Sequence, residues 1–166
     1  MFESIAGFRD GLKPTPKILP SDWADKYRIL SQKSSAKPGK WKTSYTPYLR
    51  EIMNRFSPYD MAEDIIFMKC SQIGASEAGF NMMGYIVDVD PGPLMYVMPT
   101  IDTVRKNSKV RIDPMIEETP VLRQKIKTSR SREAGNTTFQ KDFPNGVLLL
   151  VGANSAAGFK SLPIRV

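Results

Sequence analysis

The chain has 166 residues, a single cysteine, no histidine and a formal net charge of +7 at pH 7. This length is enough for one domain with a hydrophobic core, and the lone cysteine excludes an internal disulfide and favours a reducing, cytoplasmic compartment. Histidine-based acid–base or metal chemistry is excluded, and no apolar run approaches the ~20 residues of a membrane span, so no membrane partner is expected.

The first 45 residues are predicted to form an N-terminal extension, partly extended and partly helical. Met1 to Pro20 is interrupted by Pro and Gly and is expected to be extended. A short helix is predicted from Ser21 to Leu30, with Ser21 as its N-cap. A polar loop follows over residues 32–44. The main domain is then predicted to occupy residues 46–166.

The main domain is predicted to begin with a helix and continue with a strand–turn–helix unit. Thr46 followed by Pro47 is a helix start signal, and this helix is expected to end near Phe56. Asp64 to Lys69 is a short apolar run that suits a buried parallel strand. The next helix, Glu77 to Val87, is apolar on nearly all sides, as a helix packed on a sheet should be. An α/β fold follows from this pattern.

The turn between that strand and that helix resembles a phosphate-binding loop with an altered pattern. In G-x-x-x-x-G-K-[ST], backbone N–H groups surround the phosphates, a Lys reaches the outer ones and a hydroxyl holds Mg²⁺. Gly74 and Ser76 occupy the second glycine and hydroxyl positions, but Ala75 replaces the Lys. Lys69 stands at the first glycine position, where its flexible stem still allows contact with phosphate. The alternative is an ordinary turn between a strand and a helix.

The candidate phosphate-binding residues lie in one short stretch of the chain. Ser76 is a better Mg²⁺ ligand by spacing than Ser71, which is expected to hydrogen-bond within the loop. Cys70 is predicted to be a small packing residue and not a redox site. The stretch comprises Lys69, Ser71, Gln72, Ile73, Gly74, Ala75, Ser76 and Glu77.

The second half of the chain is predicted to add a buried strand, two helices and a β-hairpin. Asp90-Pro91-Gly92-Pro93 breaks the chain sharply before the strand. The hairpin is expected to turn at Asn145-Gly146. These elements are the strand Leu94–Met98, helices at Ile101–Lys109 and around Pro120–Lys127, and the strands Thr137–Phe143 and Val147–Val151.

Positive charge is concentrated in two regions. Residues 105–132 contain nine Lys and Arg against three Asp and Glu, and residues 1–45 contain nine against four. Such clustering favours contact with a polyanion, and double-stranded DNA is the expected partner. The DNA-binding candidates are Arg105, Lys106, Lys109 and Arg111. A solvated helix face is the alternative for any one of them.

Three ordered blocks resemble a known family. The segments SDWADKYRIL, KPGKWKTSYTPYLREIMN and MKCSQIGASEAGF are similar to the N-terminal ATPase region of the large terminase subunit of lambda-like tailed bacteriophages. VMPT at Val97–Thr100 and GANSAAGFKSLP at Gly152–Pro163 extend the similarity. The family also resembles this chain in carrying its Walker A lysine at the start of the loop, where Lys69 lies.

The resemblance implies a DNA-packaging motor that uses ATP and Mg²⁺. The implied fold is a P-loop NTPase of the helicase-like ASCE class, a three-layer sandwich that is incomplete here and carries a β-hairpin and an N-terminal helical extension. Expected partners are double-stranded DNA, the small terminase subunit, the portal or procapsid, and further copies of the chain, in the bacterial cytoplasm. A nuclease is expected in the complete protein.

The resemblance also suggests where adenine binds and that the middle of the loop lacks a positively charged side chain. Trp41, Tyr45 and Tyr48 lie upstream of the first strand, where such ATPases place an adenine-contacting segment; the alternative is that they are core residues. Gln72 stands where related motors often have a polar or basic residue. Gln supplies no positive charge, so any arginine-finger contribution must come from elsewhere.

The chain is expected to be an incomplete member of that family. Leu162 to Val166 resembles the start of the second catalytic strand, and no acid follows to hold Mg²⁺ or orient water. No carboxylate cluster suits a two-metal nuclease. We therefore expect nucleotide binding without turnover. The alternatives are a prophage remnant or a DNA-binding or assembly fragment, and an unrelated P-loop kinase, which the basic segment argues against.

Overall fold

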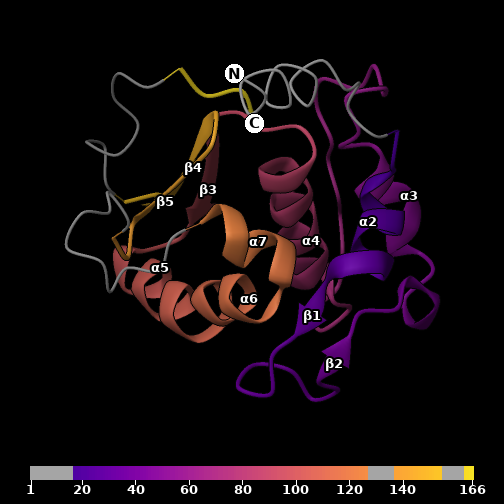
Figure 1. Ribbon diagram of the computed structural model, residues 1–166, viewed down its shortest axis with the longest axis horizontal. Coiled ribbons are helices and arrows are strands. Elements are labelled where there is room, and N and C mark those ends of the chain that lie inside the picture. Colours follow the sequence, from indigo (N-terminus) through magenta and orange to yellow (C-terminus); the bar gives the residue numbers. More distant parts are fainter. Residues whose placement is uncertain (1–16, 127–136, 155–162) are drawn as a thin grey trace, which may run out of the picture.

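The computed structural model describes residues 17–126, 137–154 and 163–166, and the expectations for residues 1–16, 127–136 and 155–162 lie outside this range. The described part of the chain contains both helices and short strands, which confirms a mixed α/β chain (Figure 1). The elements are α2 (Pro20–Tyr27), β1 (Ile29–Leu30), β2 (Gly39–Lys40), η1 (Thr43–Tyr45), α3 (Leu49–Asn54), α4 (Ala75–Asp88), β3 (Leu94–Met98), α5 (Ile101–Asn107), η2 (Ser108–Ile112), α6 (Asp113–Glu118), α7 (Pro120–Lys125), β4 (Gln140–Phe143) and β5 (Gly146–Gly152).

The main sheet has three strands in the order β3-β5-β4. β5 is apolar from Val147 to Val151 and pairs parallel to β3, with Leu94 opposite Leu148 and Met98 opposite Gly152. β4 pairs antiparallel to β5. A strand buried between two neighbours needs apolar side chains on both faces, and this explains the continuous hydrophobic run in β5.

The predicted hairpin is confirmed, but its turn lies one residue earlier than expected. Phe143 pairs with Gly146, so the two loop residues are Pro144 and Asn145. Asn145 has φ 63°, whereas Pro is restricted to negative φ. Pro followed by a residue with positive φ is the pattern of a type II turn, which replaces the expected Asn-Gly turn.

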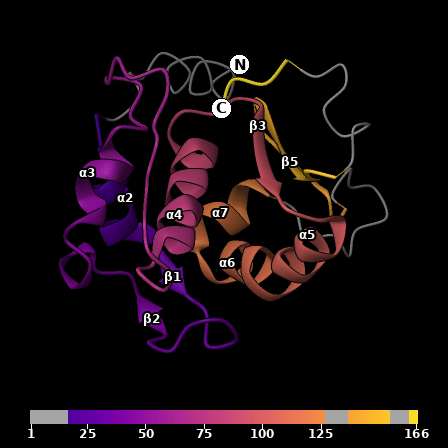
Figure 2. The same ribbon diagram turned by 180° about the vertical axis from the view of Figure 1, so that it is seen from behind.

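α4 is the central helix and lies between the sheet side of the molecule and α2 with α3, as Figures 1 and 2 show from opposite sides. Its close approach to α2 depends on Gly84, where an added Cβ would lie 2.4 Å from Cη2 of Trp23. Trp23 is fully buried and donates from Nε1 to Oδ2 of Asp88 at 2.7 Å. Lys125 of α7 pairs with Oδ1 of Asp88 at 2.9 Å, so α2 and α7 meet at the end of α4.

The strand predicted over residues 64–69 is wrong. The segment from Met61 to Cys70 follows α4 along its length (Figures 1 and 2) but is assigned no strand. Ile66 and Met68 are 93% and 96% exposed. Within the described residues no strand of either sheet pairs with this segment, so its backbone has no ladder to join. Phe67 still packs partly against the core, whereas Ile66 and Met68 point to solvent.

Two of the predicted helices near the N-terminus have different limits. α2 begins at Pro20, with Leu19 as N-cap, and Ser21 is buried inside the helix instead of capping it. The helix expected from Thr46 begins at Leu49, after the 3-10 turn η1 and a turn closed by the Leu49 N–H and the Thr46 carbonyl at 3.0 Å. β1 and β2 form a small antiparallel pair: β1 replaces the end of the helix predicted to reach Leu30, and β2 lies inside the region predicted as a loop.

The helix predicted at Ile101–Lys109 continues as a π-helical turn and a further helix that the sequence did not reveal. α5 is capped by Thr100, whose side chain accepts from the Thr103 N–H at 3.2 Å. Pro114 lacks an N–H, and in a regular helix its ring would collide with the carbonyl four residues earlier. The wider π-turn η2 lies immediately before Pro114 and relieves this conflict.

The final described residues lie beside the free edge of β3. The Met95 N–H donates to the Val166 carbonyl at 2.8 Å, and the Arg165 N–H donates to the Pro93 carbonyl at 3.0 Å. Arg165 also pairs with Asp90. The predicted strand start at this end of the chain therefore contacts the sheet, although no strand is assigned there.

Candidate functional site

The candidate phosphate loop lies at the N-terminal end of α4, close to β1 and β2 (Figure 1). Gln72 and Gly74 both have positive φ, 62° and 81°. Alternating backbone signs of this kind turn successive N–H groups toward one side and form an anion-binding concavity. Gly74 is the N-cap of α4 and offers no side-chain acceptor, so no N-cap side chain satisfies the first N–H groups of the helix.

The side chains around this loop are accessible. Lys69 is exposed and forms no ion pair within the described residues. Ser71, Gln72 and Ser76 are exposed as well. Cys70 is also exposed, which corrects the prediction that it packs in the interior. The cause is the unpaired segment before the loop, which leaves no interior for Cys70 to enter.

The loop is contacted from one side by the turn between η1 and α3 and by the first residue of α3. The Tyr48 hydroxyl donates to the Ile73 carbonyl at 3.0 Å. A Cβ added at Gly74 would lie 3.5 Å from Cδ1 of Leu49 and 3.9 Å from Cγ2 of Thr46. The segment predicted to contact adenine therefore lies against the predicted phosphate loop. The chain between the two, from Arg55 to Asp64, contains no helix or strand.

A pocket of about 400 Å³ lies beside Thr46, next to the loop. The three aromatic candidates differ in their relation to this pocket. Tyr45 lines the pocket and is 63% exposed, whereas Trp41 also lines it but is only 6% exposed and donates to Oγ1 of Thr43 at 3.0 Å. Tyr48 is tied to the loop instead. Lys37 and Lys42 place their ammonium groups 5.1 and 5.8 Å from the Tyr45 ring centre. Tyr45 is the ring best placed to stack on a flat ligand.

Glu77, in the first turn of α4, has two arginine partners. Its Oε2 accepts from Arg28 at 3.0 Å and its Oε1 accepts from Arg111 at 2.8 Å. Arg28 is almost fully buried, and burial lowers the pKa of its guanidinium while Glu77 opposes that shift. Arg111 also lies over the Phe80 ring at 5.1 Å. Sequence analysis missed Arg28, because nothing in its local pattern indicates a partner far along the chain.

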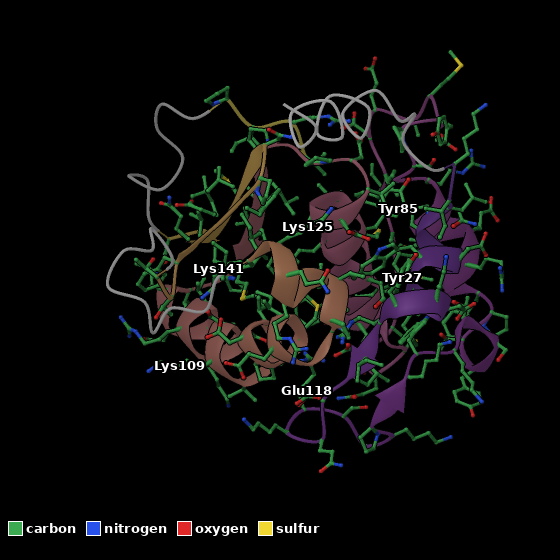
Figure 3. All side chains as sticks on the ribbon, viewed as in Figure 1. Tyr27, Tyr85, Lys109, Glu118, Lys125 and Lys141 are labelled. Carbon is green, nitrogen blue, oxygen red and sulfur yellow. The ribbon has the colours of Figure 1, made fainter. Side chains whose placement is uncertain are left out.

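The four DNA-binding candidates occupy α5 and η2 but do not share one environment. Arg105 pairs with Asp102 at 2.8 Å and lies over the Phe139 ring, and Arg111 pairs with Glu77. Lys106 and Lys109 are exposed and form no ion pair within the described ranges. Figure 3 places Lys109 at the outer edge of the molecule, on the side away from α2 and α3.

Few of the described residues suit a metal ion. No group of three or more His, Cys, Asp or Glu side chains gathers anywhere in the described part of the chain. Ser76 offers one oxygen at the loop, and Glu77 already holds two guanidinium groups. Mg²⁺ sites on nucleotides take several ligands from phosphates and water, so Ser76 fits one position of such a site and no more.

The described helices include none that is long and apolar enough to cross a membrane.

Comparison with known proteins gives one consistent result. Residues 35–166 match the family described as the phage terminase large subunit gpA, ATPase domain. The terminase large subunit of Enterobacteria phage P21 is 23% identical over 154 residues, which are 92% of this chain and 23% of that protein. The chain thus spans about a quarter of that relative. No solved structure matches the chain.

Proposed function

Because the chain belongs to the family of phage terminase large subunit ATPase domains, we propose that it is the nucleotide-binding part of a viral DNA-packaging motor. The open N-terminal end of α4 carries this proposal. The first N–H groups of the helix have no side-chain cap, two residues with positive φ shape the loop, and Lys69 is unpaired among the described residues. This combination favours a bound polyphosphate.

We place the phosphates of ATP or ADP on the backbone from Ser71 to Glu77. Lys69 supplies the mobile positive charge, and Gln72 supplies only a neutral amide. The adenine is proposed to enter the pocket beside Tyr45, whose exposed ring allows stacking. Trp41 forms the wall of that pocket, and Tyr48 holds the loop through Ile73. The domain proposed for these roles remains a P-loop NTPase over residues 46–166.

Ser76 is proposed as the protein ligand of Mg²⁺, which would neutralise phosphate charge when the nucleotide is bound. The carboxylate nearest the loop is Glu77, and two arginines already hold it. An attacking water is oriented by a polar side chain such as a carboxylate or an amide, and in this family we expect a free carboxylate in that role. We therefore propose that this chain binds nucleotide without hydrolysing it, and that ATP hydrolysis, DNA translocation and nuclease activity belong to the whole protein.

Double-stranded DNA is proposed to contact Lys106 and Lys109, with Arg105 and Arg111 beside them. Phosphate contacts of this kind are independent of sequence and weaken with salt. The small terminase subunit, the portal or procapsid and further copies of the chain remain proposed partners, in the host cytoplasm. A DNA-binding fragment without catalysis is the second candidate function, favoured by the engagement of Glu77 in ion pairs.

The test is calorimetric titration of ADP and ATP into the wild-type chain and the Lys69→Ala variant. Loss of a charged contact to phosphate is worth about 1.5–3 kcal/mol, so affinity should fall about tenfold or more. Lys17→Ala is the matched control, because Lys17 is exposed and lies far from the loop in sequence. Equal affinities for wild type and Lys69→Ala would contradict the placement of the lysine, and absence of any binding would contradict the nucleotide proposal.

A further inference from the structure

Arg111 is shared by two features of the molecule. Its guanidinium donates to Oε1 of Glu77 at 2.8 Å, in the first turn of the phosphate-loop helix. The same side chain lines a hollow of about 530 Å³ on the outer face of α5 and η2. The other residues that line this hollow are Asp102, Thr103, Lys106, Asn107 and Val110.

The two arginines around Glu77 differ in freedom. The Glu77 carboxylate pairs with two guanidinium groups, and Glu118 adds a second negative charge near Arg28 but is not paired with Arg111. The Arg28 side chain is 3% exposed and cannot leave without an unpaired buried charge, whereas the Arg111 side chain is 31% exposed. If Arg111 left, Arg28 would still neutralise Glu77.

The hollow is suited to a phosphate of a nucleic acid backbone. Lys106 contributes an ammonium group that has no ion-pair partner in the described ranges, and the Asp102 carboxylate is engaged by Arg105. Thr103 and Asn107 add short polar groups. Arg presents a planar fork of donors that matches two phosphate oxygens, which makes phosphate a competitive partner for Arg111.

We propose that Arg111 exchanges between Glu77 and a DNA phosphate in this hollow, so that DNA and nucleotide weaken each other's binding. The inference rests on the proposed function. Movement of Arg111 removes one positive charge from the first turn of α4, beside the site proposed for the nucleotide phosphates. The affinity for an anionic nucleotide must then fall, and linkage requires an equal fall in DNA affinity when nucleotide is bound.

The experiment measures the affinity of the whole chain for a fluorescent duplex by anisotropy, at fixed salt, with and without saturating ADP. In the wild type, ADP is expected to weaken DNA binding about fivefold or more, since coupling energies are typically about 1–3 kcal/mol. In Arg111→Gln the ratio of the DNA dissociation constants with and without ADP should approach one. The ADP affinity of this variant should equal that of the DNA-bound wild type. Lys106→Gln is the matched control: DNA affinity falls, but the ratio stays at the wild-type value.

The possible outcomes separate this inference from the proposed function. If both ligands bind and Arg111→Gln keeps the wild-type ratio, or if Lys106→Gln also abolishes it, the exchange is wrong while the proposed function stands. If wild type binds no nucleotide, the proposed function and the coupling both fail. Urea unfolding checks that Arg111→Gln is folded. If it is not, Arg111→Lys keeps the charge but loses the fork, and a ratio equal to that of wild type would overturn the inference.

Discussion

The two ends of α4 differ in how many contacts they make with the rest of the protein. At its C-terminal end, Trp23 and Lys125 hold Asp88, and Gly84 allows the ring of Trp23 to touch the helix backbone. At its N-terminal end, the loop residues from Lys69 to Gln72 are exposed and the helix has no side-chain cap. One end of the helix is held by tertiary contacts, and the first N–H groups at the other end have no side-chain cap, which is where we propose that the nucleotide binds.

Replacement of Trp23 should have the largest effect on the closed end. Trp23→Ala removes a fully buried ring and its hydrogen bond to Asp88. Truncation of a buried Trp typically costs about 3–5 kcal/mol, which is a large share of the stability of a small domain. Urea denaturation followed by circular dichroism should show this loss. A cost below about 1 kcal/mol would mean that α2 is not part of the core.

Gly84→Ala tests the same end with a smaller change. The new methyl group would lie 2.4 Å from Cη2 and 2.9 Å from Cζ3 of Trp23, so α2 must shift. Overpacking of this kind typically costs about 1–3 kcal/mol. Gly79→Ala is the matched control in the same helix, because an added Cβ there meets Tyr96 only at 3.7 Å. A variant Gly84→Ala as stable as Gly79→Ala would contradict the close packing of the two helices.

Substitutions in the open segment should have the smallest effect. Ile66 and Met68 are almost fully exposed, so Ile66→Ser with Met68→Ser removes no buried surface. Exposed substitutions usually change stability by no more than about 0.5 kcal/mol. Thermal unfolding of the double variant should therefore resemble that of wild type. A loss of more than about 2 kcal/mol would show that this segment is buried as a strand after all.

Sequence patterns correctly predicted the helices and strands that are determined by their own residues and their immediate neighbours in the chain. The apolar run Leu94–Met98 after a Pro-Gly-Pro break, the apolar helix α4 and the hairpin of β4 and β5 are all present. Residues 64–69 have the same apolar character, but a strand also requires a neighbour to pair with, and sequence composition does not reveal one. The hairpin turn was predicted at Asn145-Gly146 because Asn-Gly is the strongest turn signal in sequence. The pairing of Phe143 with Gly146 places the turn at Pro144-Asn145 instead, and this strand register cannot be read from the sequence.

In the candidate site, too, the features set by local sequence were predicted and those set by distant contacts were not. Sequence spacing was enough to place Gly74 and Ser76 at the N-terminus of α4, and Lys69 precedes them in the same exposed segment. The ion pairs of Glu77 join residues 49 and 34 positions away, and such contacts have no local signature. Arg111 was predicted from charge clustering as a DNA contact, whereas its bond to Glu77 depends on how α5 and η2 pack against α4.

Hydrogen–deuterium exchange with and without ADP tests the contrast between the two ends of α4 most directly. Bound phosphates should occupy the backbone N–H groups from Ser71 to Glu77 and slow their exchange, because those groups have no acceptor in the helix. Peptides covering Met83 to Asp88 should exchange at the same rate in both states. Protection confined to the C-terminal end, or no protection near Gly74 at saturating ADP, would contradict a nucleotide site at the open end of α4.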